Sequence, residues 1–115
     1  MDSKFWARLE DLVKSSEIVI DRPKGSAHPR YPEFFYPLDY GYLKGTSAID
    51  GNGVDCWMGK AEIRELTAIV CTVDIVKRDT EVKLIIGCTD EEIEIIRRVH
   101  NGPYQSGIVI KREDY

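Results

Sequence analysis

The sequence predicts a single α+β domain with a small, strongly twisted β-sheet or barrel. Three observations carry this prediction. Short runs rich in β-branched and aromatic residues alternate with turn residues, helical periodicity occurs near the start and again in the last third, and 115 residues suffice for one domain but not two. Because the chain has no repeat, linker or low-complexity segment, the predicted domain spans residues 1–115.

Two segments have the periodicity of amphipathic helices. In residues 3–15 apolar side chains recur at spacings of three and four, namely Phe5, Trp6, Leu9, Leu12 and Val13. The second segment begins at Thr89, where Thr-Asp-Glu-Glu has the pattern of a capping box. It ends near His100, which precedes Asn-Gly-Pro.

The other regular elements are predicted strands. They cover residues 18–20, 40–43, 54–58, 66–76, 81–88 and 107–111. Residues 79–80 are predicted to form the turn between the fourth and fifth of these strands. Four of the five prolines fall between residues 23 and 37, which predicts an ordered loop there rather than regular structure.

Composition narrows the function classes. A net charge of -4 lowers the expectation of nucleic-acid binding, which depends on lysine and arginine at phosphates. The chain begins with too many charges for a secretory signal, and no apolar run approaches the ~20 residues of a membrane helix. Three cysteines without CxxC spacing indicate reduced, buried thiols. We therefore expect a cytoplasmic protein that binds neither nucleic acid nor membrane.

The Gly-rich segment DGNGVD carries three short side chains with oxygen atoms, Asp50, Asn52 and Asp55. On a tight turn that leads into a strand, such side chains can converge on one small volume. Clustered oxygen ligands are what Mg²⁺ prefers. An Asp/Asn/Gly turn is also a common β-turn, so the composition alone leaves a purely structural role open.

The wider pattern resembles the soluble (family I) inorganic pyrophosphatases. YPLDYGY is followed at similar spacing by DGNGVD, VIDRP matches a strand that ends in an acid before proline, and KRDTEVKL resembles a hairpin that carries two acids and then a lysine. The resemblance covers residues 17–86. It implies a shortened and divergent member, with a small, highly twisted OB-like β-barrel, an N-terminal helix and one helix in the C-terminal half.

The resemblance also implies roles for individual residues. The implied magnesium ligands are four acids, Asp50, Asp55, Asp79 and Glu81. The implied substrate contacts are Arg30, Tyr40 and Lys83, with Tyr36 as a support of the pocket. The implied catalytic residues are Asp55, Asn52, Tyr40 and Asp21.

Together these residues predict Mg²⁺-dependent hydrolysis of inorganic pyrophosphate to two orthophosphates by metal-activated water. Asn52 stands where the family has an aspartate, and the segment before Tyr36 is too short for the family's full hairpin. The alternative is therefore a catalytically impaired relative that binds phosphate or a nucleotide, and a barrel-type single-strand binder is a third hypothesis. The resemblance also implies a homo-oligomer. His28 and His100 are interpreted as surface histidines.

Overall fold

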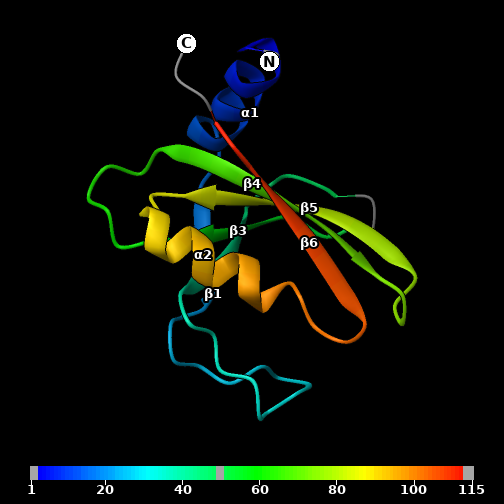
Figure 1. The fold of residues 1–115 in the computed structure, drawn as a ribbon. Helices are drawn as coiled ribbons and strands as arrows, with labels where there is room; N and C mark the ends of the chain where they lie inside the picture. Colours follow the sequence, from blue (N-terminus) through cyan, green and yellow to red (C-terminus); the bar gives the residue numbers. More distant parts are fainter. Residues whose placement is uncertain (1–2, 49–50, 113–115) are drawn as a thin grey trace.

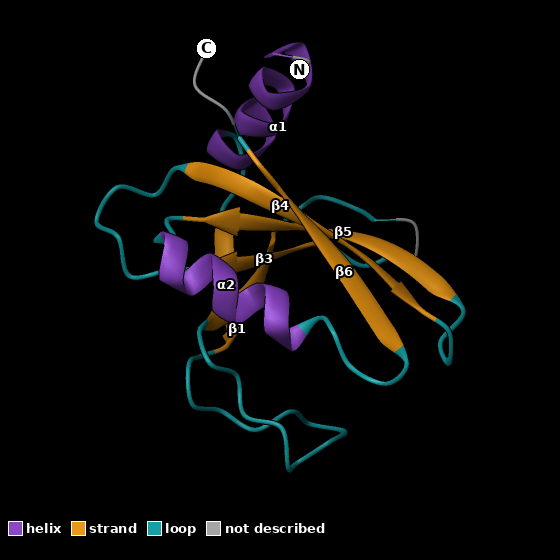
Figure 2. Cartoon of the chain, viewed as in Figure 1, coloured by secondary structure: helices purple, strands orange, loops and turns teal. Residues whose placement is uncertain are grey.

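The computed structural model describes residues 3–48 and 51–112. Within these residues the elements follow the order α1 (Ser3–Lys14), β1 (Ile18–Arg22), β2 (Asp39–Leu43), β3 (Val54–Met58), β4 (Leu66–Asp74), β5 (Asp79–Ile86), α2 (Asp90–Val99) and β6 (Gln105–Lys111), shown in Figure 1 and Figure 2. The predicted α+β class is confirmed, and both helices lie where the apolar periodicity places them.

The six described strands form one mixed sheet in the order β1-β2-β3-β5-β4-β6. Strands β3 and β5 are parallel, whereas all the other neighbours are antiparallel. The pairing leaves β1 and β6 at the two edges, so this part of the chain forms an open sheet and the predicted barrel is not confirmed.

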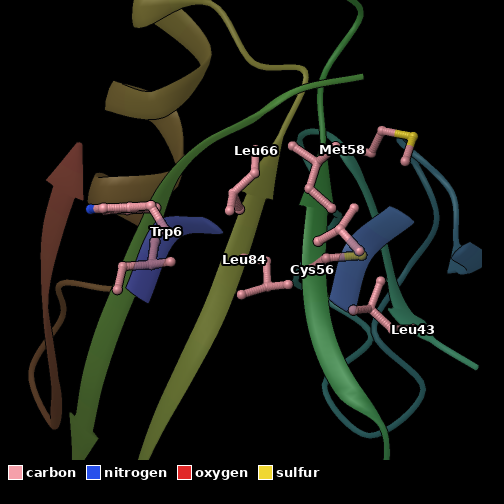
Figure 3. Packing of buried hydrophobic residues seen from close by; sticks show 9 residues of the cluster. Trp6, Leu43, Cys56, Met58, Leu66 and Leu84 are labelled. Carbon is pink, nitrogen blue, oxygen red and sulfur yellow. The ribbon is translucent and has the colours of Figure 1, made fainter. Parts of the chain in front are cut away.

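The two faces of the sheet carry separate apolar layers, because successive side chains of a strand point to opposite faces. One layer contains Leu43, Cys56 and Leu84 and packs against Trp6 of α1 (Figure 3). The other layer contains Trp57, Ile85 and further apolar residues, and it includes Ile93 and Ile96 of α2. Each helix therefore covers its own face of the sheet.

Local sequence signals set several of the element boundaries. Thr89 Oγ1 accepts the Glu92 backbone N–H at 3.2 Å, and Glu92 Oε1 accepts the Thr89 N–H at 2.9 Å, which confirms the capping box. Residues 23–37 form an ordered segment, which we call the tongue, and the prediction of an ordered loop is confirmed. Backbone hydrogen bonds of 2.8–2.9 Å tie its two sides together, between Gly25, Ser26 and Tyr36 and between His28 and Phe34.

The predicted turn at residues 79–80 is wrong. Asp74 Oδ1 accepts two backbone N–H groups of the following turn at 2.9 and 3.0 Å, and Arg78 completes the turn with a φ of 59°. Asp79 and Thr80 instead belong to β5. The hairpin turns earlier because the side chain of Asp74 satisfies the backbone groups of residues 76 and 77, which sequence periodicity does not reveal.

Strand β1 crosses β2 at an irregularity in register. The register shifts between Val19 and Arg22, so that Arg22 rather than Asp21 lies opposite Tyr40. Gly41 permits the close crossing, since a Cβ atom there would overlap the carbonyl oxygen of Val19. As a result, Arg22 at the end of β1 lies next to Tyr40, which belongs to the site described below.

None of the described helices is long and apolar enough to cross a membrane.

Replacing Gly41 by alanine is expected to cost about 2 kcal/mol or more of unfolding free energy, because the new Cβ has no room at the β1–β2 crossing. Gly102→Ala is the matched control, since nothing lies within 4 Å of its added Cβ among the described atoms. That control should change stability by less than about 0.5 kcal/mol. Urea denaturation measures both values, and equal stabilities would contradict the close crossing.

Candidate active site

Four polar side chains meet on the α2-facing side of the sheet. Lys83 Nζ lies 2.8 Å from Tyr40 Oη, 3.1 Å from Asp55 Oδ2 and 2.9 Å from Glu81 Oε2. Tyr40 donates its hydroxyl proton to Asp55 Oδ2 at 2.8 Å. We call these four residues the Lys83 cluster. They come from β2, β3 and β5, and Tyr40 and Lys83 are 43 positions apart in the sequence.

The strand register explains this convergence. Tyr40 pairs with Trp57 across β2 and β3, and Cys56 pairs with Leu84 across β3 and β5. Asp55, Trp57, Lys83 and Glu81 therefore all project from the face opposite to Cys56 and Leu84. The site is thus built from the centre of the sheet, where backbone pairing on both sides holds the strands in place.

Lys83 is a buried cation, with only 8% of its surface exposed. Burial by itself lowers the pKa of Lys83, but the negative charge of Asp55 and the hydrogen bonds to Tyr40 and Glu81 outweigh it. The pKa of Lys83 is therefore above its ordinary value, and Lys83 is protonated at neutral pH.

Tyr40 is a neutral hydrogen-bond donor. Burial raises the pKa of Tyr40 above the usual tyrosine value, and the neighbouring charge of Asp55 raises it further. The nearby charge of Lys83 acts in the opposite direction but does not cancel the effect of burial. Tyr40 therefore keeps its proton and presents it to an anionic acceptor, which is Asp55 in the structure.

An aromatic layer supports Tyr40. Its ring centroid lies 4.8 Å from that of Trp57 and 5.3 Å from that of Tyr36, and the last two side chains are 1% and 5% exposed. Trp57 Nε1 donates to His100 Nε2 at 3.0 Å, and His100 Nδ1 lies 2.8 Å from Gln105 Oε1. These contacts require the proton of His100 to be on Nδ1, and they fix the rings behind Tyr40.

The structure brings some of the predicted site residues together and separates others. Tyr40, Asp55, Glu81 and Lys83 meet, as described above. Asp79 shares a face with Glu81, but it lies two positions, about 7 Å, further along β5 and pairs with Asp74. The described residues contain no group of three acidic, histidine or cysteine side chains arranged to hold a metal ion. Asp50 lies outside the described residues.

The remaining predicted residues lie at the periphery. Asp21 is exposed on β1, and the shifted register puts its neighbour Arg22 opposite Tyr40. Asn52 is exposed in the turn before β3, where its backbone oxygen accepts the N–H of Ala48 at 2.6 Å. Arg30 is exposed on the tongue. The predicted contacts of these residues with metal or substrate stay predictions.

The sequence did not predict the positions of two residues near the cluster, Arg22 and His100. Arg22 donates to Tyr36 Oη at 2.6 Å, and no sequence signal announced the irregular register that places it there. His100 is 6% exposed rather than a surface histidine, because Trp57 and Gln105 enclose it. The alternation of side chains along β3 puts Trp57 on the same face as Asp55. Because a buried indole N–H needs a hydrogen-bond acceptor, this alternation indicated a polar partner near the site.

The donor set of the cluster fits Mg²⁺ in one binding mode. Mg²⁺ commonly keeps several water ligands and is bound by one or two carboxylates together with substrate phosphates. The described contacts use Oδ2 of Asp55 and Oε2 of Glu81, which leaves one further oxygen of each partly exposed carboxylate as a possible ligand. The described residues therefore fit a magnesium ion shared with a substrate, but not a closed protein cage.

A groove of about 880 Å³ lies against α1, and its lining includes the carboxylate residues Asp55, Asp79 and Glu81 beside many apolar residues. Its exposed apolar side chains include Phe5, Leu12, Val73, Val82 and Ile108. The described lining contains no lysine or arginine. This groove therefore does not suit a phosphate-rich substrate, and the Lys83 cluster is the better candidate for that chemistry.

No protein-family model matches the chain, and no curated protein is significantly similar to it. The similarity to pyrophosphatases therefore depends on the motifs given above and stays a prediction.

His100 should make the stability of the protein depend on pH. Burial lowers the pKa of His100 below its ordinary 6.5, so below that pH the unfolded chain binds more protons than the folded protein. Stability is thus highest above this pH and falls as the pH drops through it. Between about pH 7.5 and about pH 5.5, the urea midpoint of the parent should fall more than that of His100→Asn, which keeps an N–H donor but does not titrate. Parallel pH profiles would contradict a buried, neutral His100.

Proposed function

We propose that this chain hydrolyses inorganic pyrophosphate in a magnesium-dependent reaction at the Lys83 cluster. One observation carries the proposal. Tyr40, Asp55, Glu81 and Lys83, which the resemblance assigns to metal or phosphate, meet within hydrogen-bond distance although they come from three different strands. A buried cation, a neutral hydroxyl donor and two carboxylates are the groups that handling a polyanion requires.

Lys83 binds substrate by exchanging partners. Its ammonium group has three N–H donors, and Tyr40, Asp55 and Glu81 are three acceptors for them. A phosphate oxygen therefore replaces one of these acceptors when it reaches Lys83. The raised pKa of Lys83 means that the positive charge is already present when the anion arrives. Tyr40 supplies a second, neutral donor beside it.

The reaction itself needs no covalent intermediate with the protein. The oxygen of a water molecule forms a bond to one phosphorus, the bridging P–O bond breaks, and the bridging oxygen leaves with the second phosphate. Asp55 is a carboxylate that can accept a proton from this water, whereas the amide of Asn52 cannot. A magnesium ion bound at Asp55 and Glu81 would supply charge neutralisation and a more acidic water.

The second candidate function is magnesium-dependent binding of phosphate or a nucleotide without turnover. Two observations favour it. Asn52 lacks the charge of the family's aspartate, and only two carboxylates join the described cluster. The proposal further extends to an OB-like closure of the sheet, a cytoplasmic location and self-association, all of which the family resemblance implies.

Asp55→Asn should abolish release of orthophosphate from pyrophosphate in the presence of magnesium, because it removes a charged partner of Lys83 and a metal ligand. Asn52→Asp should preserve or raise the rate, since it restores the acid of the family motif. Glu62→Gln, an exposed acid in the loop before β4, is the matched control and should leave the rate unchanged. A colorimetric orthophosphate assay measures all three variants.

Two outcomes would count against the proposal. Turnover that is indifferent to Asp55 would remove the Lys83 cluster from the mechanism. A parent protein that releases no orthophosphate above the Asp55→Asn baseline would support binding without turnover. In that case isothermal titration calorimetry should show pyrophosphate binding that needs magnesium and weakens by about tenfold or more in Lys83→Met, because a charge-assisted hydrogen bond is lost.

A further inference from the structure

A second group of donor side chains surrounds Tyr36, next to the Lys83 cluster. His28 on the tongue accepts the backbone N–H groups of Arg30 and Tyr31 at its Nδ1 atom, at 3.0 and 3.2 Å. An imidazole that accepts at Nδ1 carries its proton on Nε2. Its ring is stacked on that of Tyr36, with centroids 6.0 Å apart and an angle of 12° between the planes. His28 is therefore a fixed, neutral N–H donor.

Arg22 reaches the same tyrosine from the end of β1. Its Nη1 donates to Tyr36 Oη at 2.6 Å, and its Cζ lies 5.7 Å from the centroid of the ring. A guanidinium group has five N–H donors, of which this hydrogen bond uses one. Because Tyr36 also contacts Tyr40 at 5.3 Å between ring centroids, Arg22 and His28 are neighbours of the Lys83 cluster.

Positive charge gathers around His28 from three separate segments. Burial lowers the pKa of His28, and the charges of Arg22, Lys77 and Arg30 lower it further. Arg22 ends β1, Arg30 lies on the tongue, and Lys77 lies in the turn between β4 and β5. In a chain with a net charge of -4, this local excess of cations around a neutral donor is suited to an oxyanion.

We propose that Arg22 and His28 form an oxyanion-binding subsite at the tongue, assisted by the charges of Arg30 and Lys77. The ligand is a phosphate-type group, either free orthophosphate or the terminal phosphoryl group of a phosphoanhydride, and this second source rests on the function proposed above. Arg22 supplies charged donors and His28 supplies its Nε2 proton, while Tyr36 holds both residues in position.

This assignment differs from the sequence-based one, in which Arg30 contacts the substrate. Arg22 is half-buried and held by Tyr36, so little further ordering is needed when an anion binds. Arg30 is exposed, so solvent screens its charge and its side chain must be ordered on binding. Arg22 should therefore contribute much more to affinity than Arg30.

The test is a titration of the whole chain with inorganic orthophosphate alone, without magnesium or pyrophosphate. Binding is followed by calorimetry and by the ¹⁵N chemical shift of His28 Nε2. The parent should show a saturable shift of this signal. Arg22→Gln should weaken orthophosphate binding by about tenfold or more, whereas Arg30→Gln, the matched control, should weaken it by about twofold or less. Thermal unfolding checks that each variant is folded.

Arg22→Lys is the second variant, because it keeps the positive charge but loses the planar fork of donors. It should weaken binding by about threefold and decides the question if Arg22→Gln does not fold. Orthophosphate that leaves the His28 signal unmoved, or binds the Arg22 variants as tightly as the parent, would overturn the subsite.

Comparing orthophosphate release from pyrophosphate with orthophosphate binding distinguishes this proposal from the proposed function. If the parent releases no orthophosphate from pyrophosphate but Arg22→Gln still weakens orthophosphate binding, the subsite stands and the hydrolase proposal fails. If turnover depends on Asp55 but orthophosphate binding ignores Arg22, the hydrolase stands and the subsite fails. If both hold, Arg22→Gln should raise the KM for pyrophosphate by about tenfold, as expected for a lost contact to a phosphoryl group.

Discussion

The site depends on one set of interactions, the hydrogen bonds of the buried Lys83 ammonium group with its three acceptors. A buried charge is costly unless it is paired and hydrogen-bonded. Here its acceptors come from β2, β3 and β5 itself, so the charge is compensated only when all three strands hold their register. The contacts that would serve phosphate binding under the proposed function thus also hold the three central strands of the sheet together. Removing one acceptor affects stability as well as chemistry, because the remaining charge stays buried.

The two faces of the sheet separate the side chain of Lys83 from the apolar layer that packs against α1. Leu84 and Ile86 point toward α1, whereas Lys83 and Ile85 point toward the α2 side, so adjacent residues of one strand serve different layers. The Trp57–His100 hydrogen bond then joins β3 to the end of α2 directly behind Tyr40. This layer of aromatic rings fixes the orientation of the Tyr40 hydroxyl without adding any charge to the site.

The sequence predicted the features that depend on neighbouring residues and missed those that depend on distant ones. The capping box at Thr89 and the bounds of β3 follow from local patterns and are confirmed. The turn after Asp74 was misplaced because a side-chain hydrogen bond, rather than periodicity, decides it. The shifted register at Arg22 depends on β1 crossing β2 at Gly41, a contact between residues about twenty positions apart. The meeting of Tyr40, Asp55 and Lys83 was expected only through the family resemblance, because no local pattern links three strands.

The strand register places Arg22, rather than its neighbour Asp21, opposite Tyr40, and this puts a positive charge beside the Lys83 cluster. An acid at that position would need a cation before a phosphate could approach, whereas a guanidinium attracts the phosphate directly. Asn52 also lowers the negative charge that the family resemblance implies, because its amide is neutral. Under the proposed function, Lys83, Arg22, Arg30 and Lys77 would therefore supply a larger share of the charge that a polyanion needs than the family resemblance implies. It follows that, under the proposed function, recognition of phosphate by this chain depends less on metal ions than its hydrolysis does.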